Sequence, residues 1–166
     1  MSRPRIISSV ITRFCEKAHM LIVEAVEILK QNKPISEVIT ITIAHQAAEM
    51  ALKGACIYQD NSIYRNSGIT ITFDEALNRS SNIISGGDRT VFSILNDIRN
   101  NYQHHAIYDN SGGIIAKDLI LDTISNIISI FNHIGYEVDE LQLIIDNENQ
   151  IFNNISTELN REEIGL

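Results

Sequence analysis

Residues 115–134 read IAKDLILDTISNIISIFNHI, and this stretch decides the fold. Its apolar residues recur every three or four positions, which is the spacing of one face of an α-helix. The side that they form is almost wholly apolar and comprises Ile120, Ile124, Ile127, Ile128 and Phe131. Because so broad an apolar side must be covered by neighbouring elements, we expect this helix at the centre of the molecule.

Amphipathic patterns elsewhere in the chain predict the remaining helices of an all-α protein. They cover residues 6–31, 36–60, 73–85, 88–108 and 139–159. Together the segments favour an up-and-down bundle of about five to six helices. We expect residues 1–136 to form this bundle, and residues 137–166 to form an acidic C-terminal helix that is packed on the bundle or appended to it.

The start of the second helix has an ambiguous pattern. Pro34 ends the first helix, and Ser36 is a suitable N-cap for the second. Residues 39–43 read ITITI, an alternation of β-branched residues that taken alone is typical of a strand. The Ala-rich continuation through residues 44–55 contains good helix formers, so we favour a helix throughout.

Two kinds of signal mark the later helix boundaries. Thr72 and Glu75 have the spacing of a capping box, so a helix is predicted to begin near Phe73. The glycine pairs at 86–87 and 112–113 are interpreted as helix stops.

The composition is that of a folded, acidic protein. The 166 residues are 44% hydrophobic and 20% charged, and they carry a formal net charge of −8. This charge works against indiscriminate binding of nucleic acid, whose affinity comes largely from neutralising phosphates. Residues 137–166 hold eight acidic residues and one basic residue, so the objection is weaker for the rest of the chain.

Neither a membrane span nor an export signal is expected. Apolar runs stop well short of the roughly 20 residues that a spanning helix needs, and Arg13, Glu16 and Lys17 interrupt the N-terminal run. We therefore expect a cytoplasmic protein. Cys15 and Cys56 lie within apolar helical patterns and lack CxxC spacing, so they are predicted to be buried free thiols.

Residues 96–105 read NDIRNNYQHH, a cluster of arginine, amide and histidine side chains on a helix that also has an apolar stripe. On a helix of 100° per residue, Arg99 lies beside the stripe, whereas His104 points about 180° away from it. Asn100 shares a face with His104, four residues on. Arg99 and His104 can meet if the helix loosens near His104, if the long Arg99 side chain bends round, or if a second copy of the protein completes the pair.

The segment from Arg99 to His104 matches the Arg-(four to six residues)-His motif of the HEPN superfamily, in which a polar residue, often Asn, follows the arginine. Residues 45–53, HQAAEMALK, look like the QAAExxLK stretch of the second HEPN helix. Residues 73–77, FDEAL, resemble the segment before the motif helix in bacterial members. These segments occur in the family's order, so the chain resembles HEPN proteins over residues 6–134.

The resemblance implies a small all-α domain that forms a homodimer and brings two Arg-His motifs into one cleft. Many HEPN proteins are metal-independent endoribonucleases of bacterial defence or toxin-antitoxin systems. The resemblance therefore implies an RNA substrate, no cofactor, and an antitoxin or a defence-complex protein as a further partner.

The same resemblance implies roles for three residues. His104 would be the general acid or base at the 2′-hydroxyl or at the leaving oxygen. Arg99 would stabilise charge on the phosphoryl oxygens, and Asn100 would position His104 or the scissile phosphate. The products would carry a 2′,3′-cyclic phosphate and a 5′-hydroxyl.

Three further residues are supporting candidates, each with a plain structural alternative. Glu49 and Lys53 match positions that the family retains, but a Glu and a Lys four residues apart also stabilise an ordinary helix. His105 falls at the edge of the apolar stripe, and we interpret it as a packed, hydrogen-bonded histidine in preference to a catalytic one.

Two other functions have some support in the sequence. Some HEPN domains have no demonstrated nuclease activity and serve dimerisation or the binding of a partner or RNA, and the net charge of −8 favours this alternative. Glu16 and His19 have the Glu-x-x-His spacing of di-iron bundles. The sequence has no second such element, so we expect no metal site.

Overall fold

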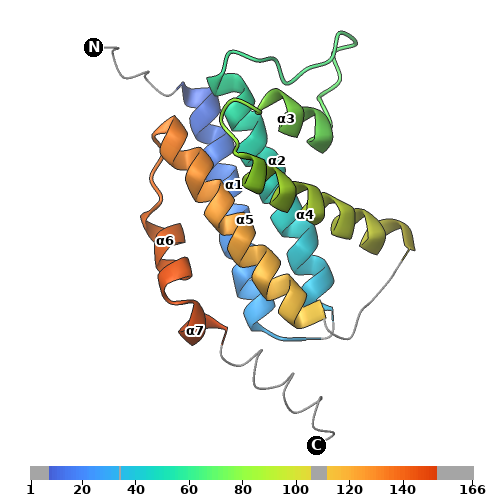
Figure 1. The fold of residues 1–166 in the computed structure, drawn as a ribbon, viewed down its shortest axis with the longest axis vertical. Helices are drawn as coiled ribbons and strands as arrows, with labels where there is room; N and C mark the ends of the chain where they lie inside the picture. Colours follow the sequence, from blue (N-terminus) through green and yellow to red (C-terminus); the bar gives the residue numbers. More distant parts are fainter. Residues whose placement is uncertain (1–7, 34, 106–111, 153–166) are drawn as a thin grey trace, which may run out of the picture.

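The structure is a computed structural model that describes residues 8–33, 35–105 and 112–152, with the backbone alone at 102–105 and 112–115. Its helices are α1 (Ser9–Lys30), α2 (Ser36–Tyr58), α3 (Phe73–Arg79), α4 (Gly86–His105), α5 (Gly112–Ile134), α6 (Asp139–Asp146) and α7 (Glu148–Ile151) (Figure 1). Within these ranges no strand forms, and Tyr64 and Thr70 make an isolated antiparallel bridge. The all-α helical bundle predicted from the sequence is therefore confirmed.

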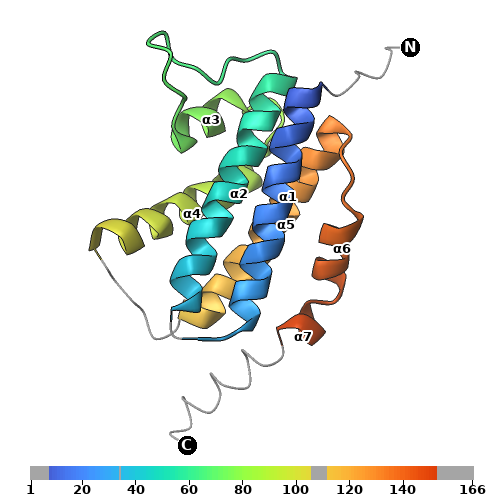
Figure 2. The same ribbon diagram turned by 180° about the vertical axis from the view of Figure 1, so that it is seen from behind.

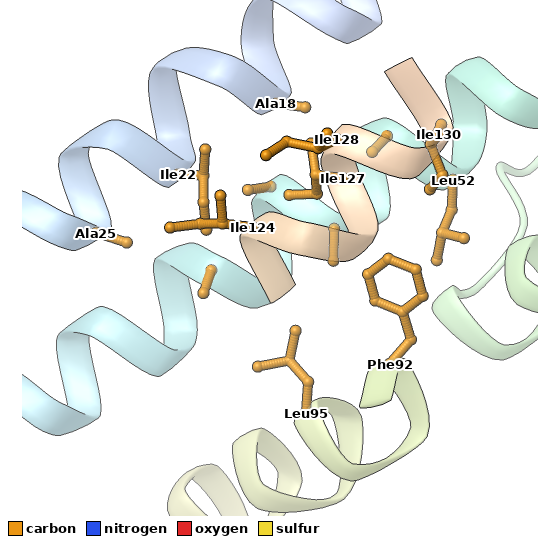
Figure 3. Close-up of a cluster of buried hydrophobic side chains, with 14 of the residues drawn as sticks. Ala18, Ile22, Ala25, Leu52, Phe92, Leu95, Ile124, Ile127, Ile128 and Ile130 are labelled. Carbon is orange, nitrogen blue, oxygen red and sulfur yellow. The ribbon is translucent and has the colours of Figure 1, made fainter. Parts of the chain in front are cut away.

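The helix α5 lies at the centre of the bundle, as its apolar side predicts. It packs against α1, α2, α4 and α6, and α1, α2 and α5 run side by side (Figure 1, Figure 2). Figure 3 shows side chains of α1, α2, α4 and α5 meeting in one apolar core. Ile120, Ile124, Ile127 and Phe131 of α5 have no exposed surface.

The helix α2 packs closely against α1 because it is rich in small buried residues. These are Ala44, Ala47, Ala48, Ala51, Gly54 and Ala55. A Cβ atom added at Gly54 would lie 3.3 Å from the Cβ of Phe14 in α1, which is tighter than almost all such contacts. The glycine therefore permits the close approach of the two helices.

Residues 39–43 are helical, so the preference for a helix over a strand is confirmed. The hydroxyl groups of this segment find acceptors within the bundle. Thr40 Oγ1 donates to the carbonyl of Ala25 in α1 at 3.3 Å, and Thr42 Oγ1 donates to the carbonyl of Val38 at 2.8 Å. Burial against α1 outweighs the strand preference of the β-branched residues.

The prediction of Ser36 as the N-cap of α2 is wrong. Ser36 is the first helical residue, the cap position is Ile35, and the Ser36 hydroxyl accepts a hydrogen bond from the Lys33 amide at 3.0 Å. The helix α1 ends at Lys30, and the predicted stop at Pro34 lies outside the described residues.

The predicted cap of α3 is confirmed, whereas its predicted length is not. Thr72 Oγ1 accepts a hydrogen bond from the Glu75 amide at 3.3 Å. The helix ends at Arg79, six residues before the predicted end. Ser80 follows it with a buried hydroxyl that lies 2.7 Å from the Ala76 carbonyl and 3.1 Å from the Leu52 carbonyl of α2, which holds the end of α3 on α2.

The glycine pairs begin helices, so their interpretation as helix stops is wrong. The helix α4 starts at Gly86, and the Ser85 hydroxyl accepts a hydrogen bond from the Asp88 amide at 3.2 Å. The serine side chain thus satisfies a free amide of the first turn, and this outweighs the low helix propensity of the glycines. The helix α5 similarly starts at Gly112.

The predicted helix over residues 139–159 is divided at Asn147 into α6 and α7, and its part beyond residue 152 lies outside the described residues. The helix α6 packs on α5 through Leu141, which has no exposed surface. His19 Nε2 of α1 and Glu140 Oε2 of α6 lie 2.7 Å apart. These contacts hold α6 on the bundle.

Cys15 and Cys56 are buried free thiols, as predicted. Burial, helped by the charge of Glu16, raises the pKa of Cys15 to about 12. Over the described part of the chain, none of the helices has both the length and the apolar character needed to cross a membrane.

Candidate functional site

Four of the predicted site residues, Arg99, Asn100, His104 and His105, belong to the half of α4 that leaves the bundle. Phe92 and Leu95 have no exposed surface and hold the first half of α4 in the core (Figure 3). Beyond them α4 extends away from α1, α2 and α5 in both views (Figure 1, Figure 2). Arg99 and Asn100 therefore lie where α4 passes from the core to the edge of the molecule.

Arg99 has a half-buried side chain, and one of its donors lacks an acceptor within the described part of the chain. Its Nη1 donates to Asn100 Oδ1 at 3.2 Å. Its Nε is buried and has no acceptor among the described residues. A buried donor without an acceptor costs about 1–3 kcal/mol, so an acceptor brought by a ligand or by a partner would stabilise this arrangement.

His104 and His105 belong to the last turn of α4, and their side chains lie outside the described part of the structure. The backbone is α-helical as far as His105. The helix therefore does not loosen near His104, which removes one of the three ways in which Arg99 could meet it. Five residues on a regular helix place backbone positions 99 and 104 about 140° apart round the helix axis.

A hydrogen-bonded network joins α4 to α2 and α3 one turn before Arg99. His45 Nε2 of α2 lies 2.8 Å from Asn96 Oδ1, and Asn96 Nδ2 donates to Asp74 Oδ1 of α3 at 3.3 Å. His45 and Asn96 are 5% and 9% exposed, whereas Asp74 lies at the surface.

The acceptors of this network fix the position of the His45 proton. An ionised carboxylate only accepts, so the Asn96 NH2 group faces Asp74 and its oxygen faces His45. The oxygen in turn needs a donor, so His45 carries a proton on Nε2. The direction of each bond is thereby set by the charge of Asp74.

The surroundings of His45 favour its neutral form. Burial lowers the pKa of His45, and the charge of Arg99 lowers it further. The hydrogen bond to Asn96 and the carboxylates of Glu49 and Asp74 raise the pKa, but by less than the sum of the opposing causes. The ring stacks on Phe73 with the ring centroids 4.4 Å apart, which closes one of its faces. His45 is thus a neutral, enclosed imidazole near neutral pH.

Glu49 and Lys53 lie on α2, one and two turns after His45. Lys53 Nζ and Glu49 Oε1 are 3.8 Å apart, and their side chains are 10% and 25% exposed. The pair is thus more enclosed than an ordinary surface pair. The charge of the Glu49 carboxylate also raises the pKa of His45. Of the two residues, Glu49 therefore lies close enough to influence the network.

Sequence reasoning missed His45, Asp74 and Asn96 as site residues. The available signal was spacing, because Asn96 precedes Arg99 by three residues and His45 precedes Glu49 by four, which places each pair on one side of its helix. The contact of Asn96 with α2 and α3 depends on tertiary packing, and no local pattern reports it.

The Glu-x-x-His spacing in α1 does not lead to a metal-ligand cluster among the described residues. Its histidine, His19, contacts Glu140 of α6. In the parts of the chain that the structure describes, no three His, Cys, Asp or Glu side chains are grouped as ligands for a metal ion.

Comparisons of the chain with models of protein families, with curated proteins and with solved structures give no match. The function of the chain is therefore inferred from its residues and their geometry.

Proposed function

We propose that this chain is a metal-independent, cytoplasmic endoribonuclease of the HEPN type that acts in a bacterial defence or toxin-antitoxin system. The observation that carries the proposal is the state of Arg99. Arg99 has a half-buried guanidinium whose buried Nε has no acceptor among the described residues, and the same helix carries Asn100 and, five residues after Arg99, His104. An RNA phosphate offers the acceptor oxygens that such a group lacks.

The chemistry divides between the three residues. His104 removes the proton of the ribose 2′-hydroxyl or donates one to the leaving 5′-oxygen. The 2′-oxygen attacks the phosphorus, the bond to the 5′-oxygen breaks, and a 2′,3′-cyclic phosphate and a 5′-hydroxyl result. Arg99 stabilises the charge that grows on the phosphoryl oxygens, and Asn100, bonded to Arg99 Nη1, orients the guanidinium or His104.

The geometry of α4 favours a site shared between two copies of the chain. Because α4 remains helical through His104, positions 99 and 104 of one chain lie about 140° apart round the helix axis. In the proposed homodimer Arg99 of one copy meets His104 of the other, and two-fold symmetry repeats the same contact on the opposite side. An antitoxin or a defence-complex protein would be a further partner.

The second candidate function is a catalytically inactive module for dimerisation or for binding a partner or RNA. The net charge of −8 favours it, because phosphate binding by the whole surface is weak at this charge.

The experiment is cleavage of labelled RNA by the purified chain in EDTA. It compares the parent with Arg99→Ala and His104→Ala, and with Arg13→Ala as a control for loss of an exposed arginine. We expect cleavage by the parent and the control, 2′,3′-cyclic phosphate ends, and loss in both site variants. If the parent is inactive, or if all four proteins cleave equally, the inactive module is the better account.

A further inference from the structure

We propose that His45, Asn96 and Asp74 form a positioning network that fixes the direction of the Arg99 side chain, with His45 held as the neutral tautomer protonated on Nε2. The consequence for RNA cleavage rests on the proposed function. The positioning of Arg99 does not, and it can be measured in a protein without activity.

Asn96 is suited to this task because one carboxamide links three helices. It accepts from His45 of α2 at 2.8 Å and donates to Asp74 of α3 at 3.3 Å. Apolar contacts, such as those of Phe92 and Leu95, tolerate small rotations of a helix, whereas two directional bonds from one buried amide do not. The network therefore sets the rotation of α4 about its own axis.

Arg99 lies next to this anchor. It follows Asn96 by three residues, which is about 60° round the helix and about 4.5 Å along it. After Asn96, no hydrogen bond links α4 to another helix in the described residues. The rotation fixed at Asn96 is thus the last such constraint before the guanidinium, and Arg99 Nε is enclosed at this junction.

His45 itself is placed to position and not to react. It is 5% exposed, and Phe73 stacks on its ring at 4.4 Å. Because the imidazole is almost fully buried and Phe73 covers one of its faces, RNA cannot reach it. A protonated His45 would also repel the Arg99 guanidinium, whereas the neutral Nε2–H tautomer satisfies Asn96 without adding charge.

Two substitutions of His45 test whether the hydrogen bond from Nε2 to Asn96 is what matters. In His45→Gln the amide nitrogen can take the place of imidazole Nε2 and donate to Asn96. In His45→Asn the shorter amide corresponds to the position of Nδ1 and does not reach Asn96. Both side chains are neutral amides, so the pair differs in the hydrogen bond and not in charge.

The direct measurement is the Nε–H signal of Arg99 in nitrogen-15 NMR spectra, assigned by its loss in Arg99→Lys. We expect this signal to shift or broaden in His45→Asn and to stay at its parental position in His45→Gln. An unchanged signal in His45→Asn, or an equal change in both variants, overturns the positioning role.

A second pair of variants covers the case in which His45→Asn does not fold. Asp74 is exposed, so Asp74→Ala removes the outer acceptor of the network without opening the core. Asp88→Ala is its control, because Asp88 also lies in the first turn of a helix but has no bond to Asn96. The Arg99 signal should move in Asp74→Ala and not in Asp88→Ala. A signal that stays at its parental position in Asp74→Ala, or that moves equally in both variants, contradicts the proposal.

Kinetics test the catalytic consequence. We expect kcat for RNA cleavage to fall about tenfold to a hundredfold in His45→Asn, with KM within about twofold of the parent, because a misdirected guanidinium loses transition-state contacts. In an Arg99→Ala background the same substitution should have no further effect on the residual rate of cleavage. A multiplicative loss in the double variant would show that His45 does not act through Arg99. If the parent cleaves no RNA, the proposed function fails while the NMR result still decides the positioning.

Discussion

Replacing Asn96 by leucine should destabilise the protein by leaving His45 without its acceptor. Leucine has a similar volume, so no large cavity opens, but the Nε2–H of a ring that is 5% exposed loses its partner. Such a buried, unpaired donor costs about 1–3 kcal/mol. Asp74 is at the surface, where water replaces the lost bond at little cost.

His45→Leu should cost a similar amount, because it leaves the Asn96 oxygen without a donor. The double variant, Asn96→Leu with His45→Leu, has neither unpaired group, and its loss of the Phe73 stacking is already present in the single variant. We therefore expect the double variant to be less destabilised than the sum of the single variants, by about 1–3 kcal/mol.

Urea unfolding followed by circular dichroism measures this coupling. With a slope of about 2 kcal/mol per M, each single substitution should lower the midpoint by about 0.5–1.5 M. Strictly additive losses would mean that the buried hydrogen bond between His45 and Asn96 does not stabilise the fold.

Three further predictions concern the core and the titration of buried groups. Gly54→Leu should lower the free energy of unfolding by about 1–3 kcal/mol, because a Cβ alone would already lie 3.3 Å from that of Phe14. An unchanged urea midpoint would contradict the close packing of α1 and α2. Cys15, with a pKa of about 12, should be ionised in about one molecule in ten thousand at pH 8 and so resist a thiol reagent until the protein is unfolded; rapid reaction of the native thiol would contradict its burial. The free energy of unfolding should fall as the pH drops below 6.5, the ordinary pKa of histidine, because the unfolded chain takes up a proton at His45 that the folded chain, with its lowered pKa, does not. His45→Gln should reduce this slope by at most about 1.4 kcal/mol per pH unit. Equal slopes in the parent and the variant would contradict the neutral state of His45.

Patterns that repeat along the chain predicted the fold well. The apolar side of residues 115–134 correctly indicated the central helix, and the alanine-rich part of α2 correctly outweighed the strand pattern at 39–43. In both cases the burial of a whole helical face decides the structure, and spacing reports that directly.

Local signals at helix ends predicted less. A glycine pair can end a helix or stand in its first turn, and both pairs were interpreted as stops although Ser85 and Asp88 have the Ser-x-x-acid spacing of an N-terminal cap. The early end of α3, in contrast, depends on the Ser80 hydroxyl and its contact with α2, which is a tertiary contact.

The role of the candidate site residues stays a prediction. The resemblance to the HEPN motif singled out Arg99 and Asn100, and in the structure Arg99 Nη1 donates to Asn100 Oδ1. The sequence could not identify the network of His45, Asn96 and Asp74, because these residues are far apart in the sequence and meet only after α2, α3 and α4 have packed.

In the function proposed here, Arg99 of one copy of the chain and His104 of another act together at one RNA phosphate. The most direct test mixes the Arg99→Ala and His104→Ala variants under conditions in which subunits exchange, and measures RNA cleavage in EDTA. If the site is shared, each mixed dimer regains one intact site, and random mixing should restore about a quarter of the parental rate. If the mixture stays as inactive as each variant alone while subunit exchange is demonstrated, the shared site is contradicted.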